Sequence, residues 1–174
     1  MTKDTKALDI IAAGWSAREW FDSGTLNVRP DWIDYNGHMN VGYYLVAFDQ
    51  ATERLCEHFG VGEAYRHESD AGIFVLEAHV TYDQEVAEGA PLQFRTRLVD
   101  CDAKRFHIVH HMIEGNEGYL AATNELMCMH VDLTEKRGTP FPEGIAEKVS
   151  ALGRAHSGLE HPHGTGRAIG IRRK

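Results

Sequence analysis

The sequence lacks several features that would assign it to particular classes of protein. None of its apolar runs approaches the ~20 residues that a helix needs to cross a membrane. Its start, residues 1–9, is polar and carries both charges, which is not the pattern of a signal peptide. Its three cysteines are unevenly spaced and form neither a disulfide framework nor a CxxC metal pair. These absences favour a reducing environment, and we expect a cytoplasmic protein without membrane contact.

Positive charge is also scarce. The chain has 18 lysines and arginines against 26 aspartates and glutamates, a formal net charge of -8. This balance argues against a nucleic-acid partner and mildly favours cationic small molecules. The sequence has no Walker-type or GxGxxG loop, so we expect no nucleotide cofactor. Its 174 residues suffice for one domain with a full core.

The apolar pattern predicts one long helix and several strands. Residues 41–59 repeat apolar side chains at three- and four-residue spacing, as one face of a helix does, and Gly60 is a natural stop. A strand at 25–28 precedes this helix, and a closing helix at 143–152 ends the pattern. After Gly72 the period becomes two, which predicts strands at 74–82, 92–99, 106–113 and 119–133. The order predicts an α+β fold, an antiparallel sheet wrapped around one long central helix.

The two ends of the chain lie outside this pattern. We divide the sequence into an N-terminal extension at 1–22, a domain at 23–155 and a tail at 156–174. The tail is rich in Gly, His and Arg and shows no core pattern. The extension lacks the Lys/Arg-rich face of a membrane-surface helix. It can form a short amphipathic helix packed on the domain, through Ile10, Ile11, Trp15, Trp20 and Phe21.

The stretch 31–40, between the first strand and the long helix, concentrates chemically active residues. It holds acids, amides, a glycine, a histidine and two aromatics, and Asn40 is a good N-cap for the helix. The start of a helix offers unpaired N–H groups and the positive end of a dipole. A carboxylate beside it suits attack on a carbonyl whose oxygen becomes negative. The alternative is a plain turn with caps.

Residues 34–40, Asp-Tyr-Asn-Gly-His-Met-Asn, resemble the Asp-x-Asn-Gly-His-Met-Asn signature of hot-dog-fold acyl-CoA thioesterases of the 4-hydroxybenzoyl-CoA thioesterase type. The resemblance spans roughly residues 25–133, and the motif lies where that family has it. It implies a hot-dog fold and hydrolysis of a short acyl-CoA thioester to a free acid and coenzyme A. Coenzyme A is then part of the substrate, and no cofactor is expected.

The resemblance makes Asp34 either the nucleophile on the thioester carbonyl or the base that activates water. The backbone N–H of Val41, with that of Asn40 or Gly42, is the expected oxyanion hole. Asn40 is either a cap or a holder of the attacking water. The alternative for Asp34 is a purely structural role in an Asx turn.

Other residues have supporting or fallback roles. Gly37 allows close approach of the backbone, and His38 either fixes the loop by a hydrogen bond or acts as a base. A related thioesterase group uses an acid on the helix, which makes Asp49 or Glu53 the fallback nucleophile. The alternative for both is a solvated or interface face of the helix.

The candidate residues for binding coenzyme A, and those for contact with a neighbouring subunit, belong to less specific sequence patterns than the motif at 34–40. Lys104 and Arg105, at a turn, are the preferred cations for the phosphates, against a solvated strand edge as the alternative. Glu77 and His79 should face away from the apolar side of their strand, where they line a neighbour's site or are surface residues. An uncovered sheet edge predicts a homodimer or homotetramer.

The histidines of the third strand of the sheet invite a metal interpretation. His107 and His111 share one face of the expected strand, but four residues of extended chain separate them by about 13 Å. This distance is too long for one zinc ion, and no nearby cysteine completes a site. We therefore expect no metal.

Residues 74–82, 102–105, 118–125 and 166–171 are similar to the thioesterases of bacterial carnitine catabolism, which act on betainyl-CoA. A quaternary ammonium is held by aromatic faces and negative charge. Trp32 and Tyr35 flank Asp34 and are the preferred rings, with Tyr43 nearby; packing in the core is the alternative. Other short, medium or aromatic acyl-CoA substrates remain open, as does a non-catalytic acyl-CoA-binding protein.

Overall fold

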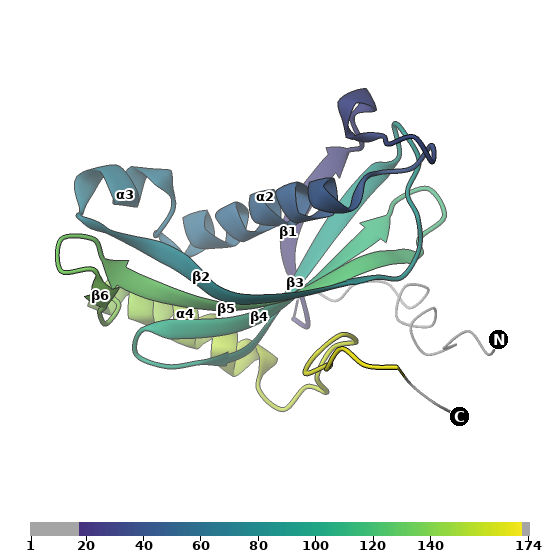
Figure 1. Ribbon diagram of the computed structural model, residues 1–174. Helices are drawn as coiled ribbons and strands as arrows, with labels where there is room; N and C mark the ends of the chain where they lie inside the picture. The colour runs from purple at the N-terminus through teal and green to yellow at the C-terminus, as the bar shows by residue number, and fades with distance from the viewer. Residues whose placement is uncertain (1–17, 172–174) are drawn as a thin grey trace.

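A curled antiparallel sheet holds one long helix in the computed structural model, which describes residues 18–171 (Figure 1). The sheet order is β1-β3-β4-β5-β2, and the short β6 pairs with β5. The expected sheet around one helix is thus confirmed. The elements are β1 (Phe21–Asn27), η1 (Pro30–Trp32), α2 (Val41–Phe59), α3 (Glu63–Glu68), β2 (Ala71–Tyr82), β3 (Pro91–Cys101), β4 (Arg105–Glu114), β5 (Leu120–Asp132), β6 (Arg137–Gly138) and α4 (Glu143–His156).

Local signals set both ends of α2 where the sequence predicts them. The Asn40 side chain accepts the Gly42 N–H at 3.0 Å and caps the first turn. Gly60 ends the helix in the left-handed region, with φ of 87°. One stripe of α2 is buried against the inner face of the sheet, by Tyr44, Ala47, Phe48, Ala51, Leu55 and Phe59.

A chain of buried hydrogen bonds joins α2 to three strands. The Thr52 hydroxyl donates to the Phe48 carbonyl, so His110 Nε2–H donates to Thr52 Oγ1 at 3.0 Å. His110 Nδ1 then accepts from the Thr96 hydroxyl at 2.6 Å, and Ser23 completes the chain on β1. Burial and the neighbouring His111 lower the pKa of His110 to about 3, so its ring stays neutral.

Strand β2 differs from the expected pattern. Its register with β5 shifts between Val75 and Glu77, which marks a bulge. The bulge breaks the alternation, and Phe74 and Leu76, expected on the buried face, are 50% and 51% exposed. Val80 beyond the bulge does pack on the core. The first half of β2 therefore presents apolar side chains at the surface.

Both ends of the domain extend further than composition suggests. Strand β1 begins at Phe21, and Trp20 is buried, so neither residue lies on the helix expected in the extension. Ile10, Ile11 and Trp15 lie outside the described residues. At the other end, the tail packs on the sheet, with Pro162 and Gly164 buried. Within residues 18–171, no helix is long and apolar enough to cross a membrane.

We predict that the free energy of unfolding falls as the pH drops from 6.5 to 5. Burial lowers the pKa of His110 to about 3 and that of His111 to about 4, whereas histidine in an unfolded chain titrates near 6.5. The unfolded state therefore binds more protons in this window. The contribution of the two neutral rings to stability is fully present above pH 6.5. Below this pH, the free energy of unfolding falls by up to ~1.4 kcal/mol per pH unit for each histidine.

Urea unfolding at pH 7, 6 and 5 measures this slope. His110→Gln should reduce the number of protons taken up on unfolding by about one and so flatten the slope. The same change at the exposed His67 should leave the slope unaltered. A slope that is unchanged in His110→Gln would contradict the assignment of a neutral buried ring.

Candidate active site

The loop before α2 is a tight turn closed on itself. An isolated bridge pairs Ile33 with Met39. Inside it, the Asp34 N–H donates to the His38 carbonyl at 3.0 Å, and the Gly37 N–H donates to the Asp34 carbonyl at 2.9 Å. Gly37 has φ of 82°, a conformation that favours glycine. The turn thus fixes Asp34 beside the start of the helix.

One oxygen of Asp34 is used by the loop and the other is free. Asp34 Oδ1 accepts the Asn36 N–H at 2.8 Å, so the Asx turn is present. Oδ2 has no hydrogen-bond partner within residues 18–171. The structural and the catalytic interpretations are therefore compatible, because the turn orients the carboxylate and leaves one oxygen for chemistry.

The first turn of α2 leaves one backbone donor unused. The Asn40 N–H donates to the Trp32 carbonyl at 2.9 Å, and the Gly42 N–H donates to the Asn40 side chain at 3.0 Å. The Val41 N–H has no acceptor among the described residues. Of the three N–H groups considered from the sequence, only that of Val41 is thus available to a developing oxyanion. The Asn40 side chain serves as the cap.

The His38 side chain lies against the segment that follows β2. Its Nε2 lies 3.5 Å from Glu85 Oε1. The next residue, Met39, donates its N–H to the Val86 carbonyl at 2.9 Å. Both contacts tie the loop to the segment after β2, which fits the loop-fixing role of His38.

Residues 28–149 match the family model of the thioesterase-like superfamily. The chain belongs to this superfamily. The expectation of a hot-dog acyl-CoA thioesterase, drawn from the motif at 34–40, is confirmed.

Related proteins agree with this membership. A betainyl-CoA thioesterase of Pseudomonas aeruginosa is 40% identical over 83% of this chain and 91% of that protein. An L-carnitine dehydrogenase/betainyl-CoA thioesterase of Ruegeria pomeroyi is 36% identical over 82% of this chain and 28% of that protein. A Staphylococcus aureus protein solved in complex with CoA superposes with a TM-score of 0.81 and 27% identity, over 88% of this chain and 96% of that chain.

Trp32 of this thioesterase lies in the core, which favours the packing alternative over a ring around the substrate. It is 4% exposed and belongs to the core cluster. Tyr43 stacks on it with ring centroids 5.5 Å apart, and the Arg29 guanidinium lies 5.9 Å from its centroid. Tyr35, the other preferred ring, is 97% exposed at the turn. Neither forms an aromatic pocket within one subunit.

Tyr82, which the sequence did not single out, lies beside the helix start instead. It ends β2, is 48% exposed, and its hydroxyl donates to the Val41 carbonyl at 3.3 Å. Its ring meets that of Tyr44 edge to face, with centroids 5.2 Å apart. Nothing in the sequence links positions 41 and 82, because only the folded sheet brings β2 back to the start of α2.

The acids on α2 are separated from the helix start. At 1.5 Å per residue, Asp49 and Glu53 lie about 12 and 18 Å along the axis from Val41. Both side chains are exposed. Burial raises the pKa of Glu53, with Asp49 adding to the shift. Within one subunit, neither can share a carbonyl with the Val41 N–H, which favours Asp34.

Lys104 and Arg105 lie at the opposite end of β3 from the loop at 31–40. The Val28 N–H donates to the Ala90 carbonyl, which places the loop at the start of β3. The basic pair follows the end of this 11-residue strand, some 30 Å away. Arg105 already binds Asp102 at 2.6 Å and holds the pKa of that carboxyl at about 2. Among the described residues, this basic pair therefore lies far from Asp34 and from the Val41 N–H.

Glu77 and His79 lie on the outer face of the sheet, away from α2. His79 pairs directly with Glu125 on β5, and paired residues share a face. The neighbouring Leu126 points into the core, so Glu125 points outward, where its carboxylate lies 2.8 Å from His107 Nε2. Glu77 and His79 therefore do not join Asp34 within their own subunit.

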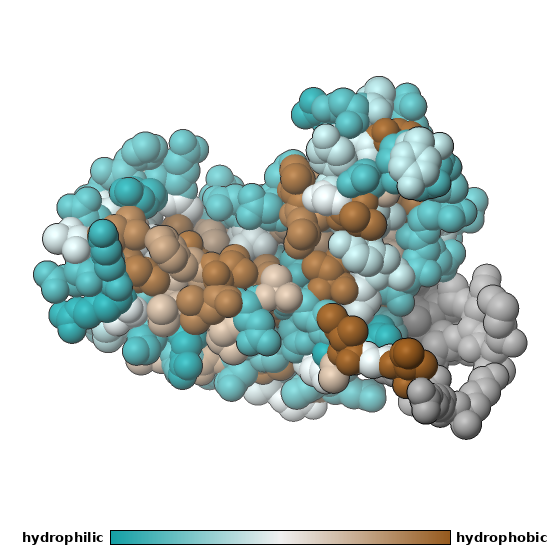
Figure 2. Space-filling view, in the orientation of Figure 1, coloured by the Kyte–Doolittle hydropathy of each residue, from teal (hydrophilic) through white to brown (hydrophobic). Residues whose placement is uncertain are grey.

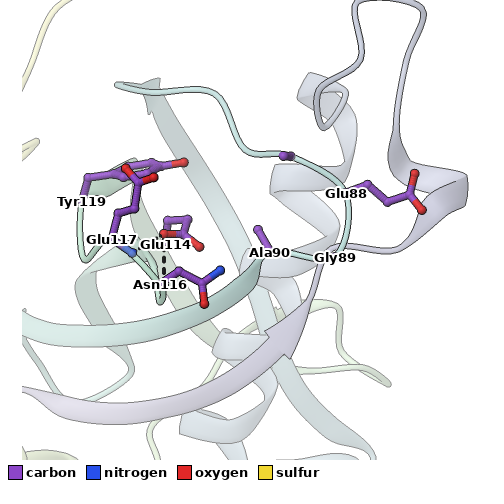
Figure 3. Close-up of a pocket in the computed structure, with 8 residues that line it drawn as sticks. Glu88, Gly89, Ala90, Glu114, Asn116, Glu117 and Tyr119 are labelled. Atoms are coloured by element: carbon purple, nitrogen blue, oxygen red, sulfur yellow. Dashed lines mark hydrogen bonds between the residues drawn. The ribbon is translucent and has the colours of Figure 1, made fainter.

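A pocket of about 340 Å³ lies beside the segment after β2 (Figure 3). Glu114 is buried at its base and accepts the Glu117 N–H at 2.7 Å. Tyr119 lines it and donates its hydroxyl to the Glu85 carbonyl. Its carboxylates, which include Glu88, repel phosphates, so this pocket is unsuited to the nucleotide end of coenzyme A.

We predict that Asp34→Asn lowers kcat by a factor of about 10² or more, because the amide cannot act as nucleophile or base. The fold should persist, since the amide oxygen still accepts the Asn36 N–H. Steady-state thiol release measures the loss, and circular dichroism checks the fold.

Asp49→Asn and Glu53→Gln are the matched controls for this prediction. Both should stay near wild-type activity. If they abolish turnover while Asp34→Asn retains it, the catalytic acid is on the helix.

Proposed function

We propose that this thioesterase hydrolyses betainyl-CoA to betaine and coenzyme A. The observation that carries the proposal is the 40% identity with a betainyl-CoA thioesterase over 91% of that protein's length. The free oxygen of Asp34 and the free N–H of Val41 support it, since thioester hydrolysis needs one group for attack and another for the oxyanion. We further propose that the protein is cytoplasmic and needs no cofactor.

Asp34 can start the reaction in two ways. In the first, Oδ2 bonds to the carbonyl carbon, the C–S bond breaks, and water later hydrolyses the mixed anhydride. In the second, Asp34 takes a proton from a water molecule as the water oxygen bonds to that carbon. In both, the carbonyl oxygen becomes negative opposite the Val41 N–H. The sulfur leaves as a thiolate and takes up a proton.

Tyr82 is our proposed ring for the cation of this substrate. One methylene separates the quaternary nitrogen of betainyl-CoA from the reacting carbonyl, so the cation must lie close to Asp34 and Val41. A quaternary ammonium cannot donate a hydrogen bond, and aromatic faces attract it. The half-exposed Tyr82 contacts Val41, and Tyr44 supports its ring. The Asp34 carboxylate supplies negative charge.

We predict that Tyr82→Leu raises KM for betainyl-CoA about tenfold, through the loss of a cation–π interaction of roughly 1–2 kcal/mol. KM for 3,3-dimethylbutanoyl-CoA, the neutral isostere, should change clearly less. Tyr82→Phe keeps the ring and should resemble the wild type. Michaelis profiles on both substrates provide the test.

An equal rise of KM on both substrates would indicate that Tyr82 is a packing residue. Trp32→Ala is the contrasting variant, because it removes a core ring; it should destabilise the fold by about 3–5 kcal/mol without separating the substrates. A wild-type preference for the neutral isostere would remove betainyl-CoA as the substrate. Binding of acyl-CoA without thiol release would favour a non-catalytic acyl-CoA-binding protein.

We also propose that the protein is a homodimer, or a homotetramer built from such dimers. Strand β2 is an edge of the sheet. Apolar side chains gather along it and beside it on α2 (Figure 2). An apolar edge with unpaired backbone groups is a liability unless another chain covers it. We name this surface the edge face; it consists of Val41, Leu45, Val46, Phe74, Val75, Leu76 and Tyr82.

We predict at least a dimer by light scattering at micromolar concentration. Leu76→Lys, which places a charge on the edge face at a half-exposed site, should shift the protein toward monomer. Ala64→Lys on the exposed surface of α3 adds the same charge and should not. A monomeric wild type would contradict the proposed assembly.

A further inference from the structure

The tail that follows α4 crosses the outer face of the sheet, on the side away from α2 (Figure 1). Its backbone is bound by side chains of three consecutive strands, β3, β4 and β5, and these contacts fix its path. The anchors are Arg97 Nη1 to the Glu160 carbonyl (3.3 Å), His111 Nε2–H to the His163 carbonyl (2.9 Å), and the Gly166 N–H to both Glu125 carboxylate oxygens (2.9 and 3.0 Å).

The backbone of the tail is held most closely at His163. Its carbonyl accepts from His111 on β4, and the next residue, Gly164, is buried with φ of 96°. A Cβ on Gly164 would lie 2.5 Å from Thr123 Oγ1, so only glycine lets the backbone come so close to β5. The His163 side chain therefore starts from a fixed point on the sheet.

This side chain reaches the residue at which β2 leaves the sheet. His163 Nε2 lies 3.5 Å from Asp83 Oδ1, and the two side chains are only 27% and 29% exposed. Asp83 Oδ2 accepts the Thr81 hydroxyl at 3.1 Å. The N–H groups of Asp83 and Gln84 both donate to the Ala121 carbonyl, at 2.9 and 3.0 Å. The contact thus lies where the path of the chain after β2 is set.

Asp83 and its neighbour Tyr82 are held from opposite faces of the sheet. Tyr82 pairs with Ala122, which belongs to the core on the side of α2, and its hydroxyl donates to the Val41 carbonyl at 3.3 Å. Asp83 meets the tail on the outer side. Consecutive side chains of a strand alternate between the faces in this way. A contact to Asp83 therefore steadies the backbone from which the Tyr82 ring projects.

We propose that His163, acting through Asp83, is a positioning residue for the active site: it holds the end of β2 so that Tyr82 stays beside the start of α2. This inference rests on the proposed role of Tyr82 as the ring for the cation of the substrate. The segment that Asp83 begins continues to the loop at 31–40, where the Val86 carbonyl accepts the Met39 N–H at 2.9 Å. The tail is thereby connected to the site from the outer face.

The order of both partners makes this contact effective. An exposed ion pair contributes little, partly because two flexible side chains must be ordered to form it. Here His111 and Gly164 fix the backbone of His163, and the hydroxyl of Thr81 orients the carboxylate of Asp83. The two groups are therefore held in place by other contacts, and the position of the tail is transmitted to β2.

Hydrogen exchange of the full-length protein tests the positioning without any substrate. His163→Ala should speed exchange of the Asp83 and Gln84 amides about threefold or more, because their bonds to Ala121 open more often. His161→Ala is the matched control. It removes the same side chain two positions earlier in the tail, where it is exposed, and should change exchange by less than about 1.5-fold. Unchanged exchange in His163→Ala would overturn the inference.

Kinetics on the cationic and the neutral substrate test the consequence for Tyr82. His163→Ala should raise KM for betainyl-CoA about threefold and KM for 3,3-dimethylbutanoyl-CoA by less than about 1.5-fold. Asp83→Asn, which removes the partner charge, should have the same effect, and the two substitutions should not add. In a Tyr82→Leu background, His163→Ala should cause no further rise, since the ring that it positions is gone.

An equal rise of KM on both substrates, or an undiminished effect of His163→Ala in the Tyr82→Leu background, would also overturn the inference. Failure of the proposed function gives a different result. If Tyr82→Leu does not separate the two substrates, the cation site at Tyr82 fails, and hydrogen exchange decides whether His163 holds the end of β2. If Tyr82→Leu separates them and His163→Ala does not, the cation site stands and the positioning role fails.

Discussion

The burial of one apolar stripe of α2 against the inner face of the sheet is the interaction on which the other features depend. Its large side chains, such as Phe48 and Phe59, are fully buried. The hydrogen bonds that the His110 ring makes with Thr52 and Thr96 add direction to this apolar contact, because they form at only one placement of the helix on the sheet. The start of α2 is thereby held at a defined place, and with it the Val41 N–H.

The candidate site is built mainly from the start of α2 and the turn that precedes it. The turn at 33–39 holds one oxygen of Asp34 and leaves the other free, and the N-cap uses the N–H of Gly42 but not that of Val41. The proposed acid and the proposed oxyanion donor thus lie within eight consecutive positions, 34–41, which are joined by short hydrogen bonds. The residues beside them come from elsewhere in the chain: Tyr82 comes from β2 and Glu85 from the segment after it.

The outer face of the sheet binds the tail that follows α4. Arg97, His111 and Glu125 point away from α2 and would be costly to bury without partners. The tail after α4 supplies them with backbone groups at 160, 163 and 166. The same contacts give the tail a defined path across the outer face.

The sequence by itself determined what depends on near neighbours. The bounds of α2 follow from Asn40, Gly60 and the spacing between them, and the motif at 34–40 led to the family. The Asx turn and the N-cap lie within the same few residues, so local chemistry was enough to predict them.

Only the tertiary structure decided what depends on distant pairing. The bulge in β2 placed Phe74 and Leu76 at the surface, although alternation alone would bury them. Trp32 was assigned to the core because Tyr43 and Arg29 lie against it, and Tyr82 was brought to Val41 across 41 positions. The tail found partners on three strands despite having no apolar pattern. In each case the deciding contact joins residues whose proximity exists only after the sheet has closed around the helix.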